Sequence, residues 1–391
     1  MNEFMRIGDI CDILNGYAFK SSKYVADGIR VIRITNVQKG FVEDTNPQYY
    51  PVSEQREIEK YMLCEGDLLM SLTGNVGRVG LLSAEMLPAA LNQRVACIRI
   101  RNPAVIYKPF LFHLLNSDYF ENKCILASQG VAQKNMSTEW LKEYPIPSFS
   151  MDKQMEIASI FDKIDDLIAR RKEQVRNMDQ AVKSRFIELF GNYDLTHPQE
   201  SWAPIKEVGT VVGGATPKTD HDEYWGGSYR WITPAELDAD SGYIYDSVRK
   251  LTKAGVESCS LQEMPVGTVI LSSRAPIGKV AIAGNTFYCN QGFKNIICKE
   301  GITPRYLYTV LLLNVEYLNS LGRGATFKEI SKGIVESIRI PVPSMELQEQ
   351  FAAFVEQTDK SKYYSSLSFR YCQAAANTYR QEWMTCRTSD F

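Results

Sequence analysis

The sequence predicts an α+β protein in which two similar globular domains alternate with two long helices. Three observations support this prediction: the chain contains one internal duplication, each globular segment mixes strand-like and helix-like runs, and two long segments have the apolar spacing of paired helices. The chain has 391 residues, enough for two or three domains. We therefore expect domains at 1–148 and 196–343, each followed by a helical segment, at 149–195 and 344–391.

The duplication is clearest where each globular segment passes into its helix. Residues 144–157 read YPIPSFSMDKQMEI, and residues 340–351 read IPVPSMELQEQF. Each places Pro-x-Pro before a polar stretch with Gln, and an apolar helical pattern follows. Gln154 and Gln348 lie 194 residues apart. A repeat at such a fixed offset indicates a duplicated structural unit.

Further matched segments lie upstream. Residues 67–80 read DLLMSLTGNVGRVG, and residues 268–280 read TVILSSRAPIGKV. Each is an aliphatic strand, a tight turn, Gly-Arg or Gly-Lys, and another apolar strand. The offset drifts from 194 to 201 residues, as expected for two divergent copies with altered loops. Two more pairs match: Asn92-Gln93 with Asn290-Gln291, and residues 130–134 with 324–328.

Each globular segment is expected to contain both strands and helices. Residues 109–116 and 304–314 are apolar and have Pro in the first turn, where a helix loses no hydrogen bond. Gly and Asn turns separate short β-branched and aliphatic runs, which indicates strands. The predicted strands are 31–34, 68–72, 95–100, 269–271, 280–282 and 295–297.

The first long segment is expected to form a helix that pairs with a second helix. Residues 151–190 contain no Pro or Gly, and their apolar residues follow steps of three and four, the heptad spacing of a coiled coil. Arg171 and Arg185 interrupt the stripe, and Gly191 ends it. About 40 residues make a rod of roughly 60 Å. The residues expected at the pairing surface are Ile157, Phe161, Ile164, Ile168, Val175, Met178, Leu347, Phe351, Phe354 and Val355.

The second helix has a weaker stripe. Thr358, Ser361 and Ser365 occupy its seam positions. A long amphipathic helix usually packs on its own domain, but two copies favour pairing as an antiparallel coiled coil. Such pairing would hold the domains at opposite ends of a rod with pseudo-twofold symmetry. The stripe is expected to resume at Cys372, Ala375, Tyr379 and Trp383.

The bulk properties limit the possible classes of function. Lys and Arg total 44 and Asp and Glu total 46, for a net charge of −2. A protein that binds DNA alone is usually basic, so this balance favours a protein whose partners share the binding. The nine cysteines form no C-x-x-C pair, which favours reduced thiols. No secretory signal or run of about 20 apolar residues is present, so we expect a cytoplasmic protein without membrane contact.

No motif for catalysis or metal binding is recognisable. His113, His197 and His221 are not at metal-ligand spacing. The glycine-rich turns lack the G-x-x-x-x-G-K-[ST] form that cradles phosphates. The nearest approach to the tetrapeptide of amino-methyltransferases, residues 46–49, differs at one position. We therefore expect no catalytic residue, no metal and no cofactor in this chain.

The ordered set of motifs resembles the specificity subunits of type I restriction–modification systems. The resemblance rests on the two Pro-x-Pro and Gln segments with their heptad helices, on SRFIELFGNY at 184–193, on the two Gly-Arg/Lys turns and on the two Asn-Gln elements. Residues 213–217 also resemble the family's G-x-T-P opening. The resemblance covers nearly the whole chain. Residues 363–391 depart from it, because they lack charged, Leu-rich heptads.

The resemblance implies a division of labour among several proteins. Each globular segment is expected to be a target recognition domain that reads one part of a split site in double-stranded DNA. The helices are expected to set the spacing and to dock two methyltransferase subunits, and motor-nuclease subunits join for cleavage. S-adenosylmethionine is expected on the methyltransferase, and ATP and magnesium on the motor-nuclease.

The physical requirements of a split-site reader agree with this resemblance. Major grooves on one face of B-DNA recur about every 34 Å, so a rod of roughly 60 Å spans at least one turn. Arg pairs with guanine, Asn or Gln with adenine, and Lys more often with phosphate. The alternative for each surface cation is an ordinary solvated side chain. The candidate DNA-binding residues, all in polar loops, are Asn75, Arg78, Arg94, Gln133, Lys134, Lys218, Arg274, Lys279, Arg323 and Lys328.

Two other readings remain open from the sequence alone. One is a non-catalytic scaffold that binds proteins through its domains and dimerises through its helices. The other is an enzyme with a nucleotide site in its glycine-rich loops. The matched Gly-Arg/Lys turns favour the DNA reader over both.

Overall fold

The chain folds into two compact units in the computed structural model. The first unit consists of Met1–Gln174 and Ser365–Phe391, and the second consists of Val175–Tyr364. Each unit contains one globular domain and a segment of each of the two long helices. The units are described separately below. The structure describes residues 4–128, 136–237, 242–259, 261–324 and 328–385.

The domain of the first unit is built on two sheets. Its strands are β1 (Phe4–Arg6), β2 (Cys11–Asn15), β3 (Ile29–Ile32), β4 (Gly40–Phe41), β5 (Tyr49–Tyr50), β6 (Leu68–Ser71), β7 (Val79–Leu81), β8 (Ala89–Leu91), β9 (Val95–Ile100) and β10 (Pro145–Pro147). The sheets have the orders β2-β9-β6-β7-β4 and β5-β3-β8, and β1 pairs with β10. The pairs β4 with β7 and β3 with β8 are parallel. Its helices are α1 (Ile7–Ile10), α2 (Gln55–Ile58), α3 (Lys108–Leu115), α4 (Asp118–Ala127) and α5 (Thr138–Glu143).

The domain of the second unit repeats this topology strand by strand. Its strands are β11 (Ala203–Pro204), β12 (Gly209–Gly213), β13 (Trp225–Ile232), β14 (Tyr243–Ile244), β15 (Arg249–Leu251), β16 (Val269–Leu271), β17 (Val280–Ala283), β18 (Tyr288–Cys289), β19 (Lys294–Cys298) and β20 (Arg339–Ile340). Their orders are β12-β19-β16-β17-β14, β15-β13-β18 and β11-β20. The parallel pairs recur as β14 with β17 and β13 with β18. Its helices are α7 (Ile205–Val208), α8 (Lys253–Ser258), α9 (Pro304–Leu313), α10 (Val315–Ser320) and α11 (Lys332–Ser337).

The predicted α+β class and the duplication are thus confirmed at the level of strand order. The strands predicted at 95–100 and 269–271 coincide with β9 and β16, and the predicted helices coincide with α3 and α9 to within one residue at either end. Residue Ile34, placed in a strand by the sequence, begins a short 3-10 turn instead. The duplication is therefore one of fold, with differences confined to short elements and loops.

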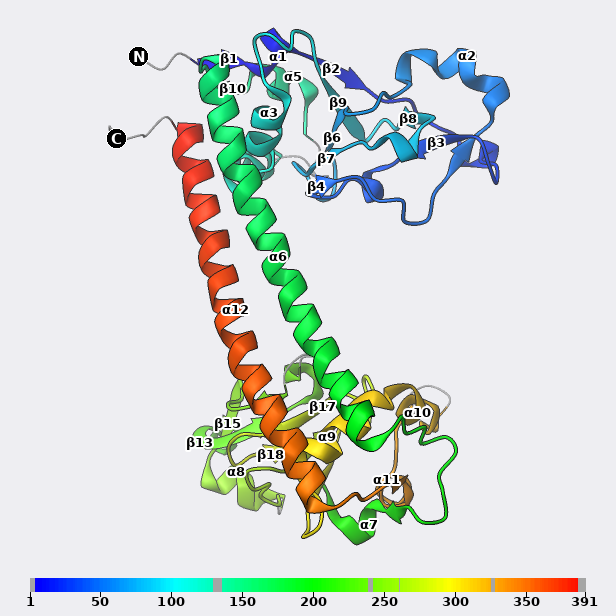
Figure 1. Cartoon of the computed structure of the whole chain (residues 1–391), viewed down its shortest axis with the longest axis vertical. Coiled ribbons are helices and arrows are strands. Elements are labelled where there is room, and N and C mark those ends of the chain that lie inside the picture. The colour runs from blue at the N-terminus through cyan, green and yellow to red at the C-terminus, as the bar shows by residue number, and fades with distance from the viewer. Residues whose placement is uncertain (1–3, 129–135, 238–241, 260, 325–327, 386–391) are drawn as a thin grey trace. The chain divides into compact units, whose positions relative to one another are not determined.

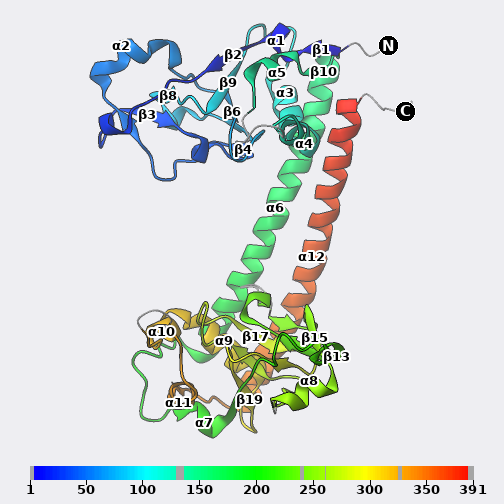
Figure 2. The ribbon, with the colours of Figure 1, turned by 180° about the vertical axis from the view of Figure 1, so that it is seen from behind.

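The start of each long helix belongs to the core of its own domain. In the first unit, Phe110 and Leu114 of α3 pack in one apolar cluster with Ile157 and Phe161. α3 and α5 lie beside this end of α6 (Met151–Phe190), whereas β3 and β8 lie farther from it (Figure 1). The view from behind shows α4 against the same helix (Figure 2). Because this cluster removes apolar surface of both helix and domain from water, it holds the two together.

A buried glutamine strengthens each junction between domain and helix. The side-chain oxygen of Gln154 accepts a hydrogen bond from the Tyr107 main-chain N–H at 2.8 Å. Its amide nitrogen donates to the carbonyls of Val105 and Phe149, at 3.0 and 2.9 Å. These bonds tie the first turn of α6 both to the start of α3 and to the Pro-x-Pro segment.

The second unit repeats this junction with different neighbours. Gln348 on α12 (Met345–Thr385) accepts from the Thr303 main-chain N–H at 2.8 Å. It donates to the carbonyls of Gly301 and Pro343, at 3.0 and 2.9 Å. Both glutamines are fully buried. The glutamine that reveals the duplication in the sequence therefore connects domain and helix by hydrogen bonds at the same place in both copies.

α6 has the bounds predicted for the first long helix, and α12 begins within the segment predicted for the second. α6 spans 40 residues, and Gly191 follows it with a φ of +87°. The Gly191 N–H donates to the carbonyl of Ile187 at 2.8 Å, which closes the last turn in a left-handed cap that favours glycine. α12 spans 41 residues and likewise contains no Pro or Gly.

Segments of the two helices run antiparallel within each unit. In the first unit, Asp165 of α6 binds Arg380 of α12 at 2.6 Å, and Lys172 lies 5.4 Å from the ring of Phe369. The residue number rises from 165 to 172 along α6 while that of the contacting residue falls from 380 to 369 along α12. In the second unit, Asp179 binds Lys362 at 2.5 Å and the rings of Phe186 and Phe351 lie 5.4 Å apart. These contacts confirm the predicted antiparallel pairing.

The residues predicted for the pairing surface are buried or half-buried, and several of them, such as Ile157 and Phe351, pack in the core of their own domain. None of the ten is classed as exposed. The buried members are Ile157, Phe161, Phe351 and Val355, and the half-buried members are Ile164, Ile168, Val175, Met178, Leu347 and Phe354.

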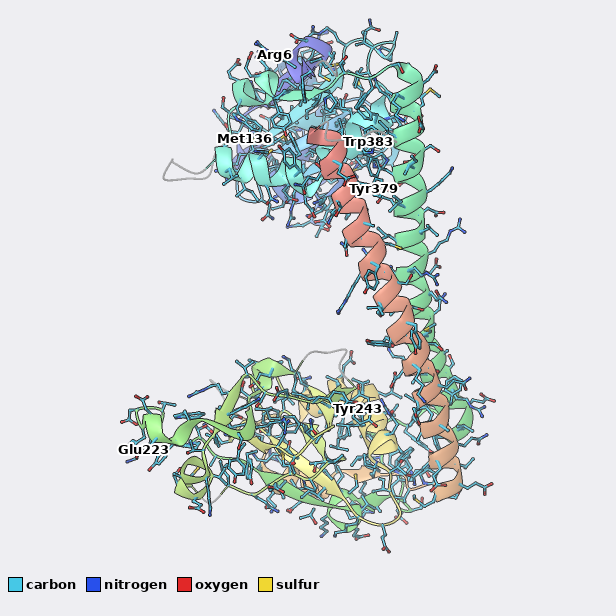
Figure 3. The ribbon with its side chains drawn as sticks, turned by 90° about the vertical axis from the view of Figure 1, so that its left-hand side faces the viewer. Arg6, Met136, Glu223, Tyr243, Tyr379 and Trp383 are labelled. Carbon is cyan, nitrogen blue, oxygen red and sulfur yellow. The ribbon has the colours of Figure 1, made fainter. Side chains whose placement is uncertain are left out.

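The seam of α12 differs from the expected one beyond Cys372. Ala375 and Tyr379 are exposed, and the adjacent Ala376 and Arg380 are buried instead. Two successive four-residue steps from Cys372 give these positions, where a heptad would take three and then four. The prediction at Ala375 and Tyr379 is therefore wrong by one residue. Trp383, which packs against Phe149 at 5.6 Å, lies on the seam as predicted, as Figure 3 shows near the end of α12.

Candidate nucleic-acid interface

The Gly-Arg/Lys turns of the two units share one hydrogen-bonding pattern. In the first, the hydroxyl of Ser71 donates to the carbonyl of Asn75 and accepts from the Arg78 N–H at 3.2 Å. In the second, the hydroxyl of Ser272 donates to the carbonyl of Pro276 at 2.7 Å and accepts from the Lys279 N–H at 2.8 Å. One serine therefore organises each turn from inside, with the exposed residues at 74–75 and 275–276 and the buried residues Val76 and Ile277 after them.

A glycine is required at the same point of each turn. Gly77 has a φ of +88° and Gly278 a φ of +90°, a region that residues with a Cβ rarely adopt. A Cβ on Gly77 would lie 2.8 Å from the Cβ of Cys124, and one on Gly278 would lie 2.9 Å from a methyl of Val315. The turns are therefore held against α4 and α10 at a distance that only glycine permits.

The basic residue that follows each glycine points into its own domain. Arg78 donates to the side-chain oxygen of Gln38 at 2.7 Å. Lys279 donates to the carbonyls of Pro234 and Leu237, at 3.1 and 2.7 Å. Both side chains reach the segment that follows β3 or β13, so each braces a loop. Two of the candidate DNA-binding cations are thus already engaged within the protein.

The Asn-Gln elements form matching turns with different side chains beside them. The side-chain oxygen of Asn92 accepts from the Arg94 N–H at 3.2 Å, and that of Asn290 accepts from the Gly292 N–H at 2.9 Å. Arg94 is exposed, and its counterpart is glycine. This difference gives the two surfaces different charge on an identical backbone.

A second difference lies at the end of the neighbouring strand pair. Ala96 pairs with Asn15 in the first unit, and Lys294 pairs with Gly213 in the second. Lys294 binds Glu329 at 3.0 Å and was not among the residues that the sequence singled out. The signal for it was its place at the first residue of a strand, just after an Asn-Gln element.

The second unit gathers several predicted cations around Glu329. Arg274 lies 3.9 Å from its carboxylate, on the turn between β16 and β17. Arg323 exchanges two main-chain hydrogen bonds with Glu329, at 3.1 and 3.0 Å. Arg323 and Lys328 are exposed, and no side-chain partner is present for them among residues 4–128, 136–237, 242–259, 261–324 and 328–385. The result is a surface with free cations held at fixed backbone positions.

Lys218 lies on another loop of the second unit, fixed by an aromatic neighbour. The indole N–H of Trp225 donates to the carbonyl of Lys218 at 3.2 Å, and the guanidinium of Arg249 lies 3.5 Å from the Trp225 ring centre. The hydroxyl of Thr216 donates to Gln291 at 2.6 Å, so this loop joins the Asn-Gln turn. Lys218 is exposed on this loop, and its amine has no partner within the part of the chain that the structure describes.

The remaining candidates are divided between exposed and undescribed positions. Asn75 is exposed at the outer side of its turn. Gln133 and Lys134 lie outside the described residues. The free cations therefore come from the loops at the end of the larger sheet in each domain, the kind of fixed, polar surface that can hold phosphates and read base edges.

Metal ligands and thiols are two kinds of potentially reactive group in the described residues. No group of three or more His, Cys, Asp or Glu in the described chain could hold a metal ion. Burial raises the pKa of the Cys11, Cys289 and Cys298 thiols to about 12, so they stay protonated and weakly nucleophilic. Within the same residues, no helix is long and apolar enough to cross a membrane.

Comparison with known proteins places this chain in a family. A family model described as the type I restriction modification DNA specificity domain matches residues 2–177 and 200–363. The two matches contain the two globular domains, and together they cover most of the chain. The chain therefore belongs to the family of type I restriction–modification DNA specificity proteins.

Individual relatives agree with this assignment. The chain is 42% identical to the MjaIX specificity subunit of Methanocaldococcus jannaschii over 184 residues, which are 46% of the chain and 42% of that subunit. It is 26% identical to the putative MjaX specificity subunit of the same organism over 380 residues, which are 91% of the chain and 86% of that subunit. The match to the EcoAI specificity subunit of Escherichia coli is 32% over 171 residues, 42% of the chain and 28% of that subunit.

Two solved structures share the fold. A chain from a structure on complex assembly and conformational transition of a type I restriction–modification system has a TM-score of 0.58 at 17% identity, with 98% of this chain and 97% of that chain covered. The S subunit from M. genitalium has a TM-score of 0.55 at 13% identity, with coverage of 98% and 96%. The two-domain, two-helix architecture is therefore shared with proteins of little sequence similarity.

Proposed function

We propose that this chain is the non-catalytic, DNA-reading subunit of a type I restriction–modification complex and that it works in the cytoplasm. Each domain reads one half of a split, asymmetric site, and the helix pair fixes the spacing and docks two methyltransferase subunits. Motor-nuclease subunits join this assembly. S-adenosylmethionine binds the methyltransferase, and ATP and magnesium bind the motor-nuclease, so the chain itself needs no cofactor.

One observation carries the proposal. The family model matches the chain in two segments, and these contain two domains of the same topology whose loop charges differ. Arg94 stands where the second unit has Gly292, and Lys294 stands where the first has Ala96. Because base edges are read by side chains on a fixed backbone, one fold with two sets of side chains reads two different half-sites.

The test is to co-express the chain with its methyltransferase partner in a host without other methylation and to map methylated bases. We expect one motif of two short defined sequences separated by a fixed number of unspecified bases. A host with the methyltransferase alone is the control and should show no such motif. A scaffold that does not read DNA would leave the two methylation maps identical.

A domain exchange tests the assignment of one half-site to each domain. Replacing residues 1–148 with the corresponding domain of another specificity subunit should change one half of the motif and leave the other half and the spacing intact. If both halves changed together, the model of two independent readers would be wrong.

A further inference from the structure

A cluster of charged and aromatic side chains joins the end of α12 to the first domain. Arg380 of α12 binds both carboxylate oxygens of Asp165 on α6, at 2.6 and 2.7 Å. His113 of α3 lies 2.8 Å from Asp162 and 3.5 Å from Asp165. All three helix segments belong to the first unit. We call this set of four residues the ionic latch.

The guanidinium of Arg380 is taken out of water to make this contact. Arg380 is 8% exposed, and its guanidinium carbon lies 5.0 Å from the centre of the buried Phe161 ring. Its Nε has no hydrogen-bond partner among the described residues. Desolvating a charge in this way is offset only where its partner is correctly placed. Arg380 is therefore favoured at a position of α12 that places its guanidinium against a carboxylate of α6, which Asp165 supplies.

At the equivalent position of the second unit, aromatic side chains pack together in place of the ion pair. Phe186 precedes Arg380 by 194 residues, the offset of the helices in the duplication. It packs against Phe351 and Tyr306, with ring centres 5.4 and 5.7 Å away. Asp359, the counterpart of Asp165, binds Arg305 of its own domain at 2.9 Å. A nearly fully buried charge thus stands at this position in the first unit, where the second unit has a phenylalanine, whereas the Asp179–Lys362 pair of the second unit is more exposed.

On the turns before Arg380, the buried residues of α12 are small, whereas Trp383 beyond it packs against Phe149. Ser365 and Ala376 are the buried seam residues on the turns before Arg380. Small side chains fit many neighbours, so they discriminate weakly between one register and the next. A single polar group at a seam position specifies register in paired helices, at some expense of stability.

We propose that Arg380 is a positioning residue that fixes the register of the last turns of α12 against α6 and the first domain. Asp165 is its acceptor, and His113 and Asp162 complete the latch. Apolar packing stabilises the contact between the helices, and the buried ion pair determines their register. For its effect on DNA spacing the inference rests on the proposed function, but the register itself can be measured without it.

The experiment compares variants of the full chain. Arg380→Met removes the charge and keeps a long apolar side chain, and Asp165→Asn leaves Arg380 buried without a counter-charge. The exchanged pair, Asp165→Arg with Arg380→Asp, restores an ion pair with reversed polarity. Arg370→Met, at an exposed position of the same helix, is the matched control.

Register is read from the distance between spin-labelled amino acids placed at Glu173 and Gln373, exposed positions of α6 and α12 in the first unit. The original chain and the Arg370→Met control should give one narrow distance distribution. Arg380→Met should add a population displaced by about 5 Å, roughly one helical turn. The exchanged pair should return the distribution to a single peak, a rescue that loss of packing alone does not predict.

A second variant keeps the test decisive where a single change unfolds the helix end. Arg380→Leu with Asp165→Ala removes both charges together, so no buried charge is left uncompensated, and such replacements are often neutral or stabilising. We expect its melting temperature to match that of the original chain while its distance distribution broadens. One narrow peak in this variant at the original distance would overturn the proposal.

Methylation mapping links the register to function. In complex with the methyltransferase, the latch variants should methylate sites with more than one spacing, or should methylate the original sites at least about tenfold less. An original chain that directs no methylation would refute the proposed function and leave the distance measurement to decide the register. If the double variant Arg380→Leu with Asp165→Ala methylated the same sites to the same extent as the original chain, Arg380 would have no role in DNA spacing.

Discussion

Ser71 and Ser272 make the same pair of hydrogen bonds in the two units, each with one carbonyl four residues ahead and one N–H seven residues ahead. A single hydroxyl thereby closes the loop whose outer side carries Asn75 in one domain and Arg274 in the other. The backbone of the surface is thus conserved between units while its side chains differ. This relationship makes the turn a good place to separate stability from recognition.

The glycine in each turn should be intolerant of a side chain. We expect Gly77→Ala and Gly278→Ala each to lower the free energy of unfolding by about 2–4 kcal/mol, since each combines positive-φ strain with a close contact. Chemical denaturation measures this. Gly40→Ala and Gly301→Ala are matched controls, because both glycines have positive φ with nothing within 4 Å of the added Cβ. Equal losses in test and control variants would show that crowding contributes nothing.

The buried glutamines should be more sensitive than exposed ones. Gln154→Leu leaves one N–H and two carbonyls of the main chain without their partner, and Gln348→Leu does the same. We expect each to reduce the free energy of unfolding by about 2–4 kcal/mol. Gln180→Leu, at an exposed position of α6, should change it by less than about 0.5 kcal/mol. Domain-resolved hydrogen exchange should place each loss in its own unit.

The first unit should lose stability on mild acidification through His113. Burial lowers the pKa of His113 below 6.5, and the nearby Arg380 adds to this, although Asp162 and Asp165 act in the opposite direction. The unfolded chain therefore binds the proton more readily than the folded one. The contribution of neutral His113 to the free energy of unfolding is fully present above pH 6.5. It falls as the pH drops below this value, by at most about 1.4 kcal/mol per pH unit.

A substitution isolates this titration from that of the carboxylates. His113→Thr copies Thr309, its counterpart at the same place on α9, and should flatten the stability profile between pH 6.5 and 5.5. A slope that persists in His113→Thr would assign the pH dependence to other groups.

The free and braced cations should behave differently in DNA binding. In complex with the methyltransferase, we expect Arg323→Ala and Lys328→Ala each to weaken binding and to reduce the salt dependence of the affinity by about one phosphate contact. Their melting temperatures should stay unchanged. Lys253→Ala, which breaks only a 3.7 Å ion pair on α8, is the control.

Lys279→Ala should show the opposite pattern. Its amine supplies two carbonyls with hydrogen bonds inside the domain, so its loss should lower the free energy of unfolding by about 1–3 kcal/mol. Any effect on DNA affinity should follow from that loss. A Lys279→Ala protein of normal stability with weakened DNA binding would place this amine at the interface instead.

The sequence predicts the fold well because its signals are local and occur twice. Pro-x-Pro with Gln marks both helix starts, and Gly191 marks the end of α6 through backbone conformation alone. Side-chain direction is less accessible. Arg78 and Lys279 follow a glycine in a polar turn, as a DNA-contacting residue would, yet carbonyl and amide groups brought near by tertiary folding draw them inward.

The same limit explains the seam of α12. Heptad spacing places Tyr379 at the seam because an aromatic ring suits burial, whereas the structure buries Arg380. The carboxylate that makes this possible, Asp165, lies 215 residues away in the sequence. Lys294 was missed for a related reason: its neighbour Glu329 lies 35 residues away in the sequence. Charge pairing over such separations has no local periodicity to reveal it.

Gln154 and Gln348 each bond one main-chain N–H and two main-chain carbonyls, and the Thr303 hydroxyl adds a fourth bond to Gln348. The residues that supply the three shared bonds differ between the copies: Val105, Tyr107 and Phe149 in one, Gly301, Thr303 and Pro343 in the other. Because the three shared hydrogen bonds involve main-chain groups, this junction does not depend on the side chains of the residues that supply them. Globular domains with different surfaces can then be exchanged on the same long helices. A new DNA specificity can therefore arise by recombination without a compensating substitution at the junction between domain and helix.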